Sequence, residues 1–275
     1  MKVSFVVPTK NSARTIANCL SSLQRQLGDV EIIVVDNNSS DGTAEIARRY
    51  ADVVEIAGPE RSAQRNIGAR LATGDVVMFV DSDMTLEPNV ASEISRTFDD
   101  ESQLGALIVP ERSFGEGFWS SCRVLEKSLY VGDDAVEAPR AFRQDVWAEL
   151  GGWDETLTAA EDWDLADRTR ALGVAIGRVD AWIWHDEGTL RLRGTFGKKR
   201  YYGRWIAQYL STHKSEGGRK LARTSLFNKP GVLARHPLQT SGMLLLKSVE
   251  AAGLAAGALD ARRESKRSEL VGIAA

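Results

Sequence analysis

The sequence predicts an α/β protein in which a mainly parallel central sheet is flanked by helices and followed by a C-terminal helical extension. Short apolar runs rich in β-branched residues alternate with segments whose apolar residues recur at helical spacing. This alternation is typical of parallel strands joined by helices. The composition agrees, because 275 residues with 43% hydrophobic and 27% charged side chains fit a soluble protein with a large core.

The first part of the chain is predicted to contain four strands and the helices that connect them. Pro8 is expected to end the first strand, and Gly28 is expected to end the first helix, whose apolar face reaches Leu27. The predicted strands are residues 3–7, 31–35, 53–56 and 76–80, and the predicted helices are residues 16–27, 43–50 and 62–72.

The rest of the chain is less regular, and its composition changes near residue 215. A helix is expected to begin at Pro88, with further helices at residues 114–130, 145–150 and 161–172 and strands at residues 106–109, 138–143, 174–179 and 181–184. Gly217-Gly218 indicates a hinge. We therefore predict two parts, a domain at residues 1–215 and a helical tail at residues 216–275.

Charge and cysteine content narrow the functional class. A formal net charge of −3 at pH 7 does not indicate a nucleic-acid binder. Cys19 and Cys122 form neither a CxxC pair nor a metal-binding spacing, which fits a reducing cytoplasm. The first apolar run is too short for a signal peptide, and no uninterrupted apolar stretch is long enough to span a bilayer. The sequence therefore predicts a cytoplasmic protein that binds no nucleic acid.

Asp81 and Asp83 follow the buried-looking strand at residues 76–80, at the edge of the sheet where α/β proteins bind ligands. Two residues apart in extended backbone, their carboxylates can face the same way and repel each other unless a cation lies between them. Mg²⁺ and Mn²⁺ prefer such oxygen ligands and often share them with substrate phosphates. The pair therefore predicts a metal–phosphate site.

The loops after the first two strands support this prediction. Neither G-x-G-x-x-G nor G-x-x-x-x-G-K follows the first strand, so a cation held by Asp81 and Asp83 is the expected phosphate anchor. Asp36 ends the second strand at the same edge of the sheet. Its carboxylate either accepts hydrogen bonds from a nucleobase or a ribose, or it stabilises the turn that follows, and Asp41 has the features of a helix cap.

A set of short motifs also occurs along the chain in a characteristic order. The motifs are VVPTKN at residues 6–11, VVDNNSSDGT at 34–43, RNIG at 65–68, TGD at 73–75, FVDSD at 79–83, AFR at 141–143, GGWD at 151–154 and EDWDL at 161–165 with Arg168. Over roughly residues 3–205, this ordered set resembles the inverting family 2 glycosyltransferases with the GT-A (nucleotide-diphospho-sugar transferase) fold.

The resemblance implies a role for each matching position. Residues implied to border the nucleotide are Pro8, Thr9, Asp36 and Arg65. Asp83 would be the direct ligand of a divalent metal, Mn²⁺ or Mg²⁺, and Asp81 would lie beside it, nearer the ribose. The implied donor is a UDP- or GDP-linked sugar, and the implied acceptor is a hydroxyl group, either on a lipid-linked molecule or on a glycan precursor.

The resemblance assigns catalysis to Glu161-Asp162, with Asp162 as the base. In an inverting transfer, the acceptor hydroxyl loses its proton as it attacks the face opposite the leaving diphosphate. A carboxylate at the start of a helix can be held for this task, and the metal balances the charge that grows on the diphosphate. The alternative is ordinary acidic capping of a helix N-terminus.

Two further positions are open to two interpretations. His185 follows the strand at residues 181–184, where some relatives place a ligand of the metal or diphosphate, and the alternative is a structural histidine packed beside Trp184. Arg204 belongs to a basic and aromatic cluster at residues 198–205. That cluster either closes over the diphosphate of the nucleotide or forms a solvated helix face.

The tail contains an apolar segment at residues 243–259, interrupted by Lys247 and Glu250 and followed by basic residues. This pattern fits a peripheral helix on the inner face of a membrane, attracted by anionic lipids. It equally fits a core helix or a helix that contacts a second copy of the chain. The sequence leaves these alternatives open.

A different enzyme class uses a similar aspartate pattern. Residues 77–85 fit the h-h-h-h-D-x-D-x-T pattern of haloacid-dehalogenase-like phosphatases, with Asp81 as nucleophile and Asp83 as acid. That strand normally opens the phosphatase fold, whereas three strand–helix units precede it here, and Glu161-Asp162 would have no role. A sugar nucleotidyltransferase would need a glycine-rich basic loop after the first strand. We therefore predict a metal-dependent inverting glycosyltransferase.

Overall fold

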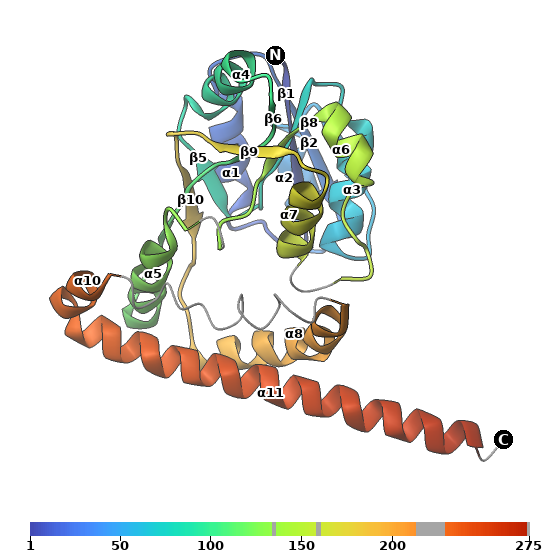
Figure 1. Ribbon diagram of the computed structural model, residues 1–275, viewed down its shortest axis with the longest axis vertical. Helices are drawn as coiled ribbons and strands as arrows, with labels where there is room; N and C mark the ends of the chain where they lie inside the picture. Colours follow the sequence, from blue (N-terminus) through green and yellow to red (C-terminus); the bar gives the residue numbers. More distant parts are fainter. Residues whose placement is uncertain (134–135, 158–160, 213–228, 274–275) are drawn as a thin grey trace. The chain divides into compact units, whose positions relative to one another are not determined.

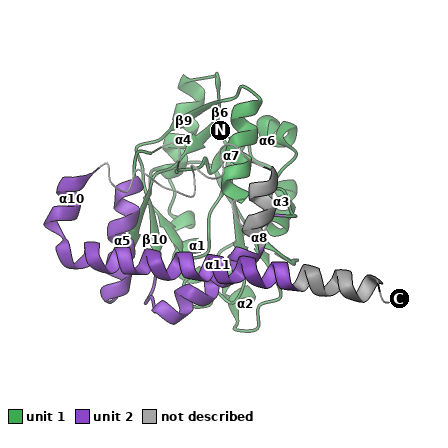
Figure 2. Cartoon of the chain, turned by 60° about the horizontal axis from the view of Figure 1, so that its bottom comes forward, with its two compact units in different colours: residues 1–113, 131–156, 161–186 green, residues 114–130, 157–160, 187–275 purple. Residues whose placement is uncertain are grey.

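The computed structural model describes residues 1–133, 136–157, 161–212 and 229–273, and the chain divides into two compact units. Unit 1 comprises residues 1–113, 131–156 and 161–186, and unit 2 comprises residues 114–130, 157–160 and 187–275 (Figure 2). The predicted hinge at Gly217-Gly218 lies outside the described residues. The division of the chain near residue 215 therefore stays a prediction.

A seven-stranded sheet forms the middle of unit 1, in the order β3-β2-β1-β4-β8-β6-β9 (Figure 1). The paired strands are parallel except where β8 pairs with β4 and β6, so the predicted mainly parallel sheet is confirmed. The strands are β1 (Val3–Thr9), β2 (Val30–Asp36), β3 (Val53–Ile56), β4 (Val76–Phe79), β6 (Leu104–Ile108), β8 (Ala141–Arg143) and β9 (Ala175–Arg178).

Helices cover both faces of this sheet. Phe5 of β1 belongs to a buried cluster with side chains of α1 and α4, whereas its neighbour Val6 belongs to a second cluster with α3, α6 and α7. Successive strand residues point to opposite faces, so the two clusters lie on opposite sides of the sheet. The helices of unit 1 are α1 (Ile16–Gln24), α2 (Thr43–Ala47), α3 (Arg61–Leu71), α4 (Val90–Asp100), α6 (Gln144–Leu150) and α7 (Glu161–Ala171).

A second sheet has three short strands in the order β5-β10-β7. Its strands are β5 (Met84–Leu86), β10 (Ile183–Asp186) and β7 (Glu111–Phe114). β5 and β7 were not predicted, because strands of three and four residues carry little periodic signal and form here by pairing with residues distant in the chain. The pairing places His185 opposite Met84, the residue after Asp83.

Two local expectations are wrong. β1 does not end at Pro8 but continues to Thr9. Pro8 has no amide hydrogen to donate, but the pairing of β1 with β4 already ends at Val6. The proline therefore interrupts no hydrogen bonds between these two strands. The first helix ends at Gln24, and Leu27, which was expected on its apolar face, is 59% exposed.

Unit 2 contains helices, including the predicted C-terminal helical extension. They are α5 (Phe118–Tyr130), α8 (Leu192–Thr212), α10 (Pro230–Arg235) and α11 (Pro237–Ile273). Glycines let α11 approach α8 closely: a Cβ at Gly253 would lie 2.8 Å from the carbonyl oxygen of Phe196, and Gly257 is similarly crowded by the backbone of Arg200.

Candidate active site

The carboxyl ends of β1 and β2 lie side by side, and the last partners in their register are Thr9 and Asp36. Gln64 of α3 ties these ends together by donating to the carbonyl oxygens of Thr9 (3.0 Å) and Val35 (2.6 Å). Thr9 is 3% exposed, and its hydroxyl has no hydrogen-bond partner among the residues that the structure describes. Buried hydroxyls are normally bonded, so this one is available to a ligand. The predicted nucleotide contacts of Pro8 and Thr9 remain predictions.

Asp36 is buried and engaged by the loop that follows β2. Its Oδ2 accepts the backbone N–H of Ser39 at 2.8 Å, and its Oδ1 accepts the hydroxyl of the same residue at 2.5 Å. In this conformation the carboxylate stabilises the turn, which was one of its two expected roles. Its contact with a base or ribose remains a prediction. Asp41 precedes Gly42, the N-cap residue of α2, and accepts the backbone N–H of Thr43, the first residue of the helix.

Arg65 joins two acidic segments that are far apart in the sequence. Its Nη2 lies 2.8 Å from Oδ1 of Asp81, and its Nη1 lies 3.4 Å from Oδ1 of Asp162. The side chain is 1% exposed, and its guanidinium carbon lies 4.4 Å from the ring centre of Trp153. The helix α3 therefore delivers a fixed, buried positive charge between the aspartate pair after β4 and the acidic start of α7.

Asp81 is held by two arginines. Besides Arg65 on Oδ1, Nη1 of Arg140 lies 3.5 Å from Oδ2. Burial alone would raise the pKa of Asp81, but the two guanidinium groups outweigh burial and hold the pKa well below its usual range. Asp81 is therefore ionised at neutral pH, and both of its oxygens face cations that the chain itself supplies.

Asp83 has different surroundings. Its side chain is 42% exposed, and its Oδ2 lies 3.4 Å from Nε2 of His185, while Nδ1 of His185 lies 2.8 Å from Oε1 of Glu111. Burial would lower the pKa of His185, but hydrogen bonds to Asp83 and Glu111 raise it to about 10. The short second sheet thus brings together Asp83 and His185, two of the three predicted metal-site residues, of which Asp81 is the third.

The donor set fits a hard divalent cation that is shared with a ligand. Among the described residues, no group of three or more His, Cys, Asp and Glu side chains is arranged to hold a metal by itself. Asp83 and His185 offer one carboxylate and one imidazole nitrogen, and Glu111 orients the imidazole from its other nitrogen. Mg²⁺ and Mn²⁺ commonly take few protein ligands and complete their shell with water and phosphate oxygens. Asp81 fits this role less well, because arginines face both of its oxygens.

Glu161 and Asp162 begin α7 but differ in exposure. Glu161 is 5% exposed, and Nη2 of Arg61 lies 2.8 Å from its Oε1. Burial and the neighbouring Asp162 raise the pKa of Glu161, whereas Arg61 and Arg65 lower it less. Asp162 is 46% exposed and has one oxygen near Arg65. Asp162 is therefore accessible from solvent, whereas Glu161 is enclosed.

Two residues that were not predicted, Arg140 and Glu111, complete this cluster. Arg140 bridges Asp81 to Glu111, whose Oε2 lies 3.1 Å from its Nη2. Neither residue lies in a motif, and their contacts span distant segments, so no local signal identifies them. Arg204 was expected near the nucleotide; it lies on α8 of unit 2, with its guanidinium 4.0 Å from the carboxylate of Asp260, and its role in binding remains a prediction.

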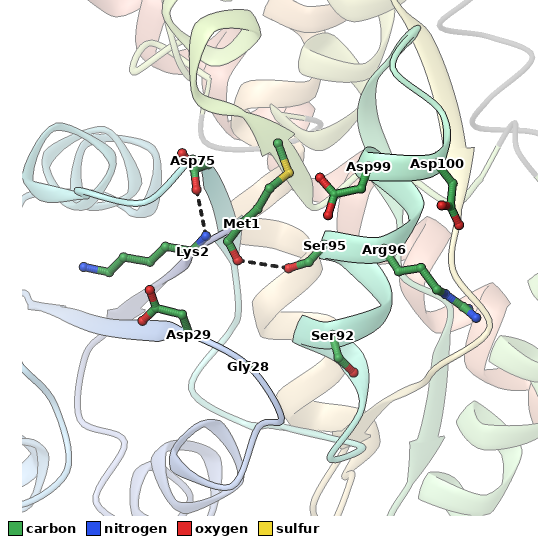
Figure 3. A pocket seen from close by; sticks show the side chains of 10 residues that line it. All are labelled: Met1, Lys2, Gly28, Asp29, Asp75, Ser92, Ser95, Arg96, Asp99 and Asp100. Atoms are coloured by element: carbon green, nitrogen blue, oxygen red, sulfur yellow. Dashed lines mark hydrogen bonds between the residues drawn. The ribbon is translucent and has the colours of Figure 1, made fainter.

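A hollow in unit 1 lies at the start of β1 and is unrelated to these residues (Figure 3). It is lined by Met1 and Lys2, by Asp75 before β4 and by α4 residues such as Ser95, whose hydroxyl bonds the Met1 carbonyl at 3.1 Å. These residues belong to the amino ends of β1 and β4, whereas Asp81 and Thr9 belong to the carboxyl ends. Ligands of parallel sheets bind at carboxyl ends, so the hollow is not the candidate site.

The family relationship is direct for the first part of the chain. Residues 4–138, which contain the aspartate pair and the segments that surround it, match the model of Glycosyl transferase family 2. The predicted resemblance to the family 2 glycosyltransferases is thereby confirmed.

Similar proteins extend the comparison over more of the chain. The pre-mycofactocin glycosyltransferase of Mycobacterium tuberculosis is 27% identical over 222 residues, which are 73% of this chain and 46% of that protein. The chain spans less than half the length of the curated relatives that it matches.

Two solved structures show the fold. One is the Pyrobaculum calidifontis mannosyltransferase PcManGT in complex with GDP-Man and Mn²⁺, which matches with a TM-score of 0.57 and 20% identity. The match covers 98% of this chain and 80% of the PcManGT chain. The other is S. aureus TarS 1-349 in complex with UDP-GlcNAc, which matches with a TM-score of 0.54 and 19% identity. This match covers 98% of this chain and 92% of the TarS chain. The predicted GT-A fold is thereby confirmed.

Proposed function

We propose that this protein is a metal-dependent, inverting glycosyltransferase that moves a sugar from a UDP- or GDP-linked donor to a hydroxyl acceptor. The observation that carries the proposal is the bridge made by Arg65 between Asp81 and Asp162. It places the aspartate pair expected at the donor diphosphate and the carboxylate expected at the acceptor in one connected cluster.

In this mechanism, Asp162 accepts the proton of the acceptor hydroxyl as that oxygen attacks the anomeric carbon. Its partly exposed carboxylate is accessible to an acceptor, and Arg65 orients one of its oxygens. Glu161, held by Arg61, supports the start of α7 and does not receive the proton. The attack inverts the anomeric centre because the hydroxyl approaches from the face opposite the leaving diphosphate.

On the donor side, Asp83 and His185 would hold Mn²⁺ or Mg²⁺, and Asp81 would keep Arg65 and Arg140 in place. The cation, when bound, supplies positive charge to the leaving diphosphate. Thr9 offers its unbonded hydroxyl, with Pro8 and Asp36 beside it, to the nucleoside. PcManGT with GDP-Man and Mn²⁺, and TarS with UDP-GlcNAc, support these donor classes and this cofactor by analogy of fold.

The acceptor is proposed to be a lipid-linked molecule or a glycan precursor, in the cytoplasm. The two cysteines of the chain are both free and buried, which suits a reducing compartment. A phosphatase of the haloacid-dehalogenase type is not supported, because that chemistry needs Asp81 as a free nucleophile. Here arginines face both Asp81 oxygens.

The test is a screen of UDP- and GDP-sugars by thermal stabilisation with and without Mn²⁺, followed by NMR of the product formed from the best donor. We expect metal-dependent stabilisation by one nucleotide class and a product with inverted anomeric configuration. A product with retained configuration, or turnover that is unaffected by a chelator, would contradict the proposal.

A further inference from the structure

The solvent-facing side of α11 has no charge along 22 residues. All exposed side chains from Leu238 to Leu259 are uncharged: Leu238, Ser241, Leu244, Leu245, Ser248, Ala251, Ala252, Ala255 and Leu259. The four leucines in this set are 72%, 47%, 49% and 51% exposed, in chain order. We call these nine residues the outer face of α11. Surface helices normally carry charged side chains on such a face.

The charged residues of this part of α11 point the other way, into unit 2. Lys247 pairs with Glu126 of α5, and Glu250 pairs with Arg123 of α5 and with Lys199 of α8. Glu126 and Glu250 are buried. Because a buried ion pair is costly to break, this network sets the rotation of α11 about its axis. The outer face is therefore turned away from α5 and α8 by the packing of unit 2.

Positive charge lies at both ends of the outer face. Arg235 is exposed just before α11 begins, and Arg262 and Arg263 are exposed just after Leu259. Within residues 229–263 no acidic side chain is exposed, because Asp260 is half-buried and bonds Arg200 at 2.6 Å. The outer face is thus an apolar strip with cationic ends.

We propose that the outer face of α11 binds the surface of an anionic lipid bilayer, with the helix axis parallel to the membrane plane. The leucines enter the boundary between headgroups and acyl chains, and the terminal arginines pair with lipid phosphates. Twenty-two helical residues extend about 33 Å, which gives a long contact line. This inference does not depend on the sugar that the enzyme transfers.

Two other arrangements fit the structure less well. Residues Pro237–Arg263 are long and apolar enough to cross a membrane by length and composition, and an 18-residue window within them has a mean hydropathy of 1.4. A crossing would place the ion pairs of Lys247 and Glu250 in hydrocarbon, which is costly. Pairing of two outer faces would bring cationic ends together in both the parallel and the antiparallel orientation.

The test is co-sedimentation of the full chain with phosphatidylcholine vesicles, with and without phosphatidylglycerol. We expect binding to the anionic vesicles that weakens as salt is added. Leu244→Glu/Leu245→Glu should lower the partition coefficient at least about tenfold. The matched control is Leu27→Glu/Leu172→Glu, which replaces two exposed leucines of unit 1 and should bind as the parent does. Equal binding by both double variants would overturn the proposal.

Arg262→Glu/Arg263→Glu provides a second variant that leaves the packed side of α11 intact. This variant should bind anionic vesicles more weakly than the parent chain does. Unchanged binding would contradict the proposed contact between these arginines and lipid phosphates. Light scattering without vesicles distinguishes self-association from membrane binding. If the parent chain is a dimer that Leu244→Glu/Leu245→Glu dissociates, and the parent chain binds no vesicles, the outer face contacts a second copy of the chain and the proposal is overturned.

The orientation is tested with an environment-sensitive fluorophore on Leu238→Cys, Leu245→Cys and Leu259→Cys in turn. Cys19 and Cys122 are buried, so the introduced thiol takes the label. Similar shallow depths at all three positions support a helix in the membrane plane. A deep middle position between two shallow ends indicates a spanning helix and contradicts the proposal.

Discussion

Arg65 and Asp81 form an ion pair of 2.8 Å in which the arginine is 1% exposed. The same guanidinium also reaches Asp162, 3.4 Å away, so one side chain of α3 sets the positions of two acidic groups that come from different segments. Its five N–H donors in a rigid plane suit this bridging role, which a lysine would not reproduce.

Replacing this arginine should therefore affect stability as well as activity. Arg65→Met leaves the carboxylate of Asp81 without its nearest partner, and we expect a loss of about 3 kcal/mol in the free energy of unfolding. Arg65→Lys should recover part of the stability but not the nucleotide affinity, because it cannot hold Asp81 and Asp162 together. Denaturant unfolding and donor titration measure both effects. Full recovery of affinity by lysine would show that only the charge matters.

Asp162 and Glu161 should respond differently to loss of charge. Asp162→Asn keeps the shape but cannot accept a proton, so turnover should fall by about 10²-fold or more while the donor affinity changes little. Glu161→Gln should retain more turnover and mainly lower the melting temperature, because Glu161 is enclosed and bonded to Arg61. Initial rates and donor titrations of both variants are compared. The opposite pattern would move the base to Glu161.

Asp83 is expected to control the metal dependence of nucleotide binding. Asp83→Ala should abolish the enhancement of nucleoside diphosphate binding by Mn²⁺, because it removes the exposed carboxylate beside His185. Asp29→Ala, an exposed aspartate before β2, is the matched control and should behave as the parent does. Calorimetric titrations with and without Mn²⁺ distinguish them. Enhancement that survives in Asp83→Ala would place the cation elsewhere.

Glu111 is expected to act through His185. Glu111→Gln weakens the bond to Nδ1 and the ion pair with Arg140, so Mn²⁺ affinity should fall about tenfold or more while the fold is kept. NMR of the imidazole should report the changed surroundings of His185 directly. An unchanged histidine signal would rule out this positioning role.

Glu250 should make unit 2 sensitive to acid. Burial would raise the pKa of Glu250, but Arg123, Lys199 and Lys247 outweigh burial and lower it from 4.5 to about 2. A depressed folded-state pKa adds stability above the unfolded value, and this stability is lost as the pH falls from about 4.5 to 2. The full difference is on the order of 3 kcal/mol.

Glu250→Gln should remove this part of the pH dependence, measured as thermal unfolding between pH 7 and about pH 3. Glu149→Gln, which alters an exposed glutamate of α6, is the control and should follow the parent curve. If the parent and Glu250→Gln lose stability in parallel on acidification, the buried network of unit 2 does not contribute through Glu250.

The site was predictable where its residues lie in local motifs. Asp81 and Asp83 follow a continuous apolar strand, and Glu161-Asp162 begins a helix with an evident acidic start. Their residue types and their places at element ends point to the chemistry before any contact is known. Arg140 and Glu111 were not predictable, because their importance consists entirely of contacts with distant segments.

The sequence by itself determined the alternation of strands and helices, the family resemblance and the acidic residues that follow β4 and begin α7, because periodicity and motif order are local properties. Only the tertiary structure decided which carboxylates are neutralised by arginine and which stay accessible. It also decided which side of α11 is left uncharged. Both depend on burial and on contacts between segments far apart in the chain, since a side chain's charge and exposure depend on its neighbours in space.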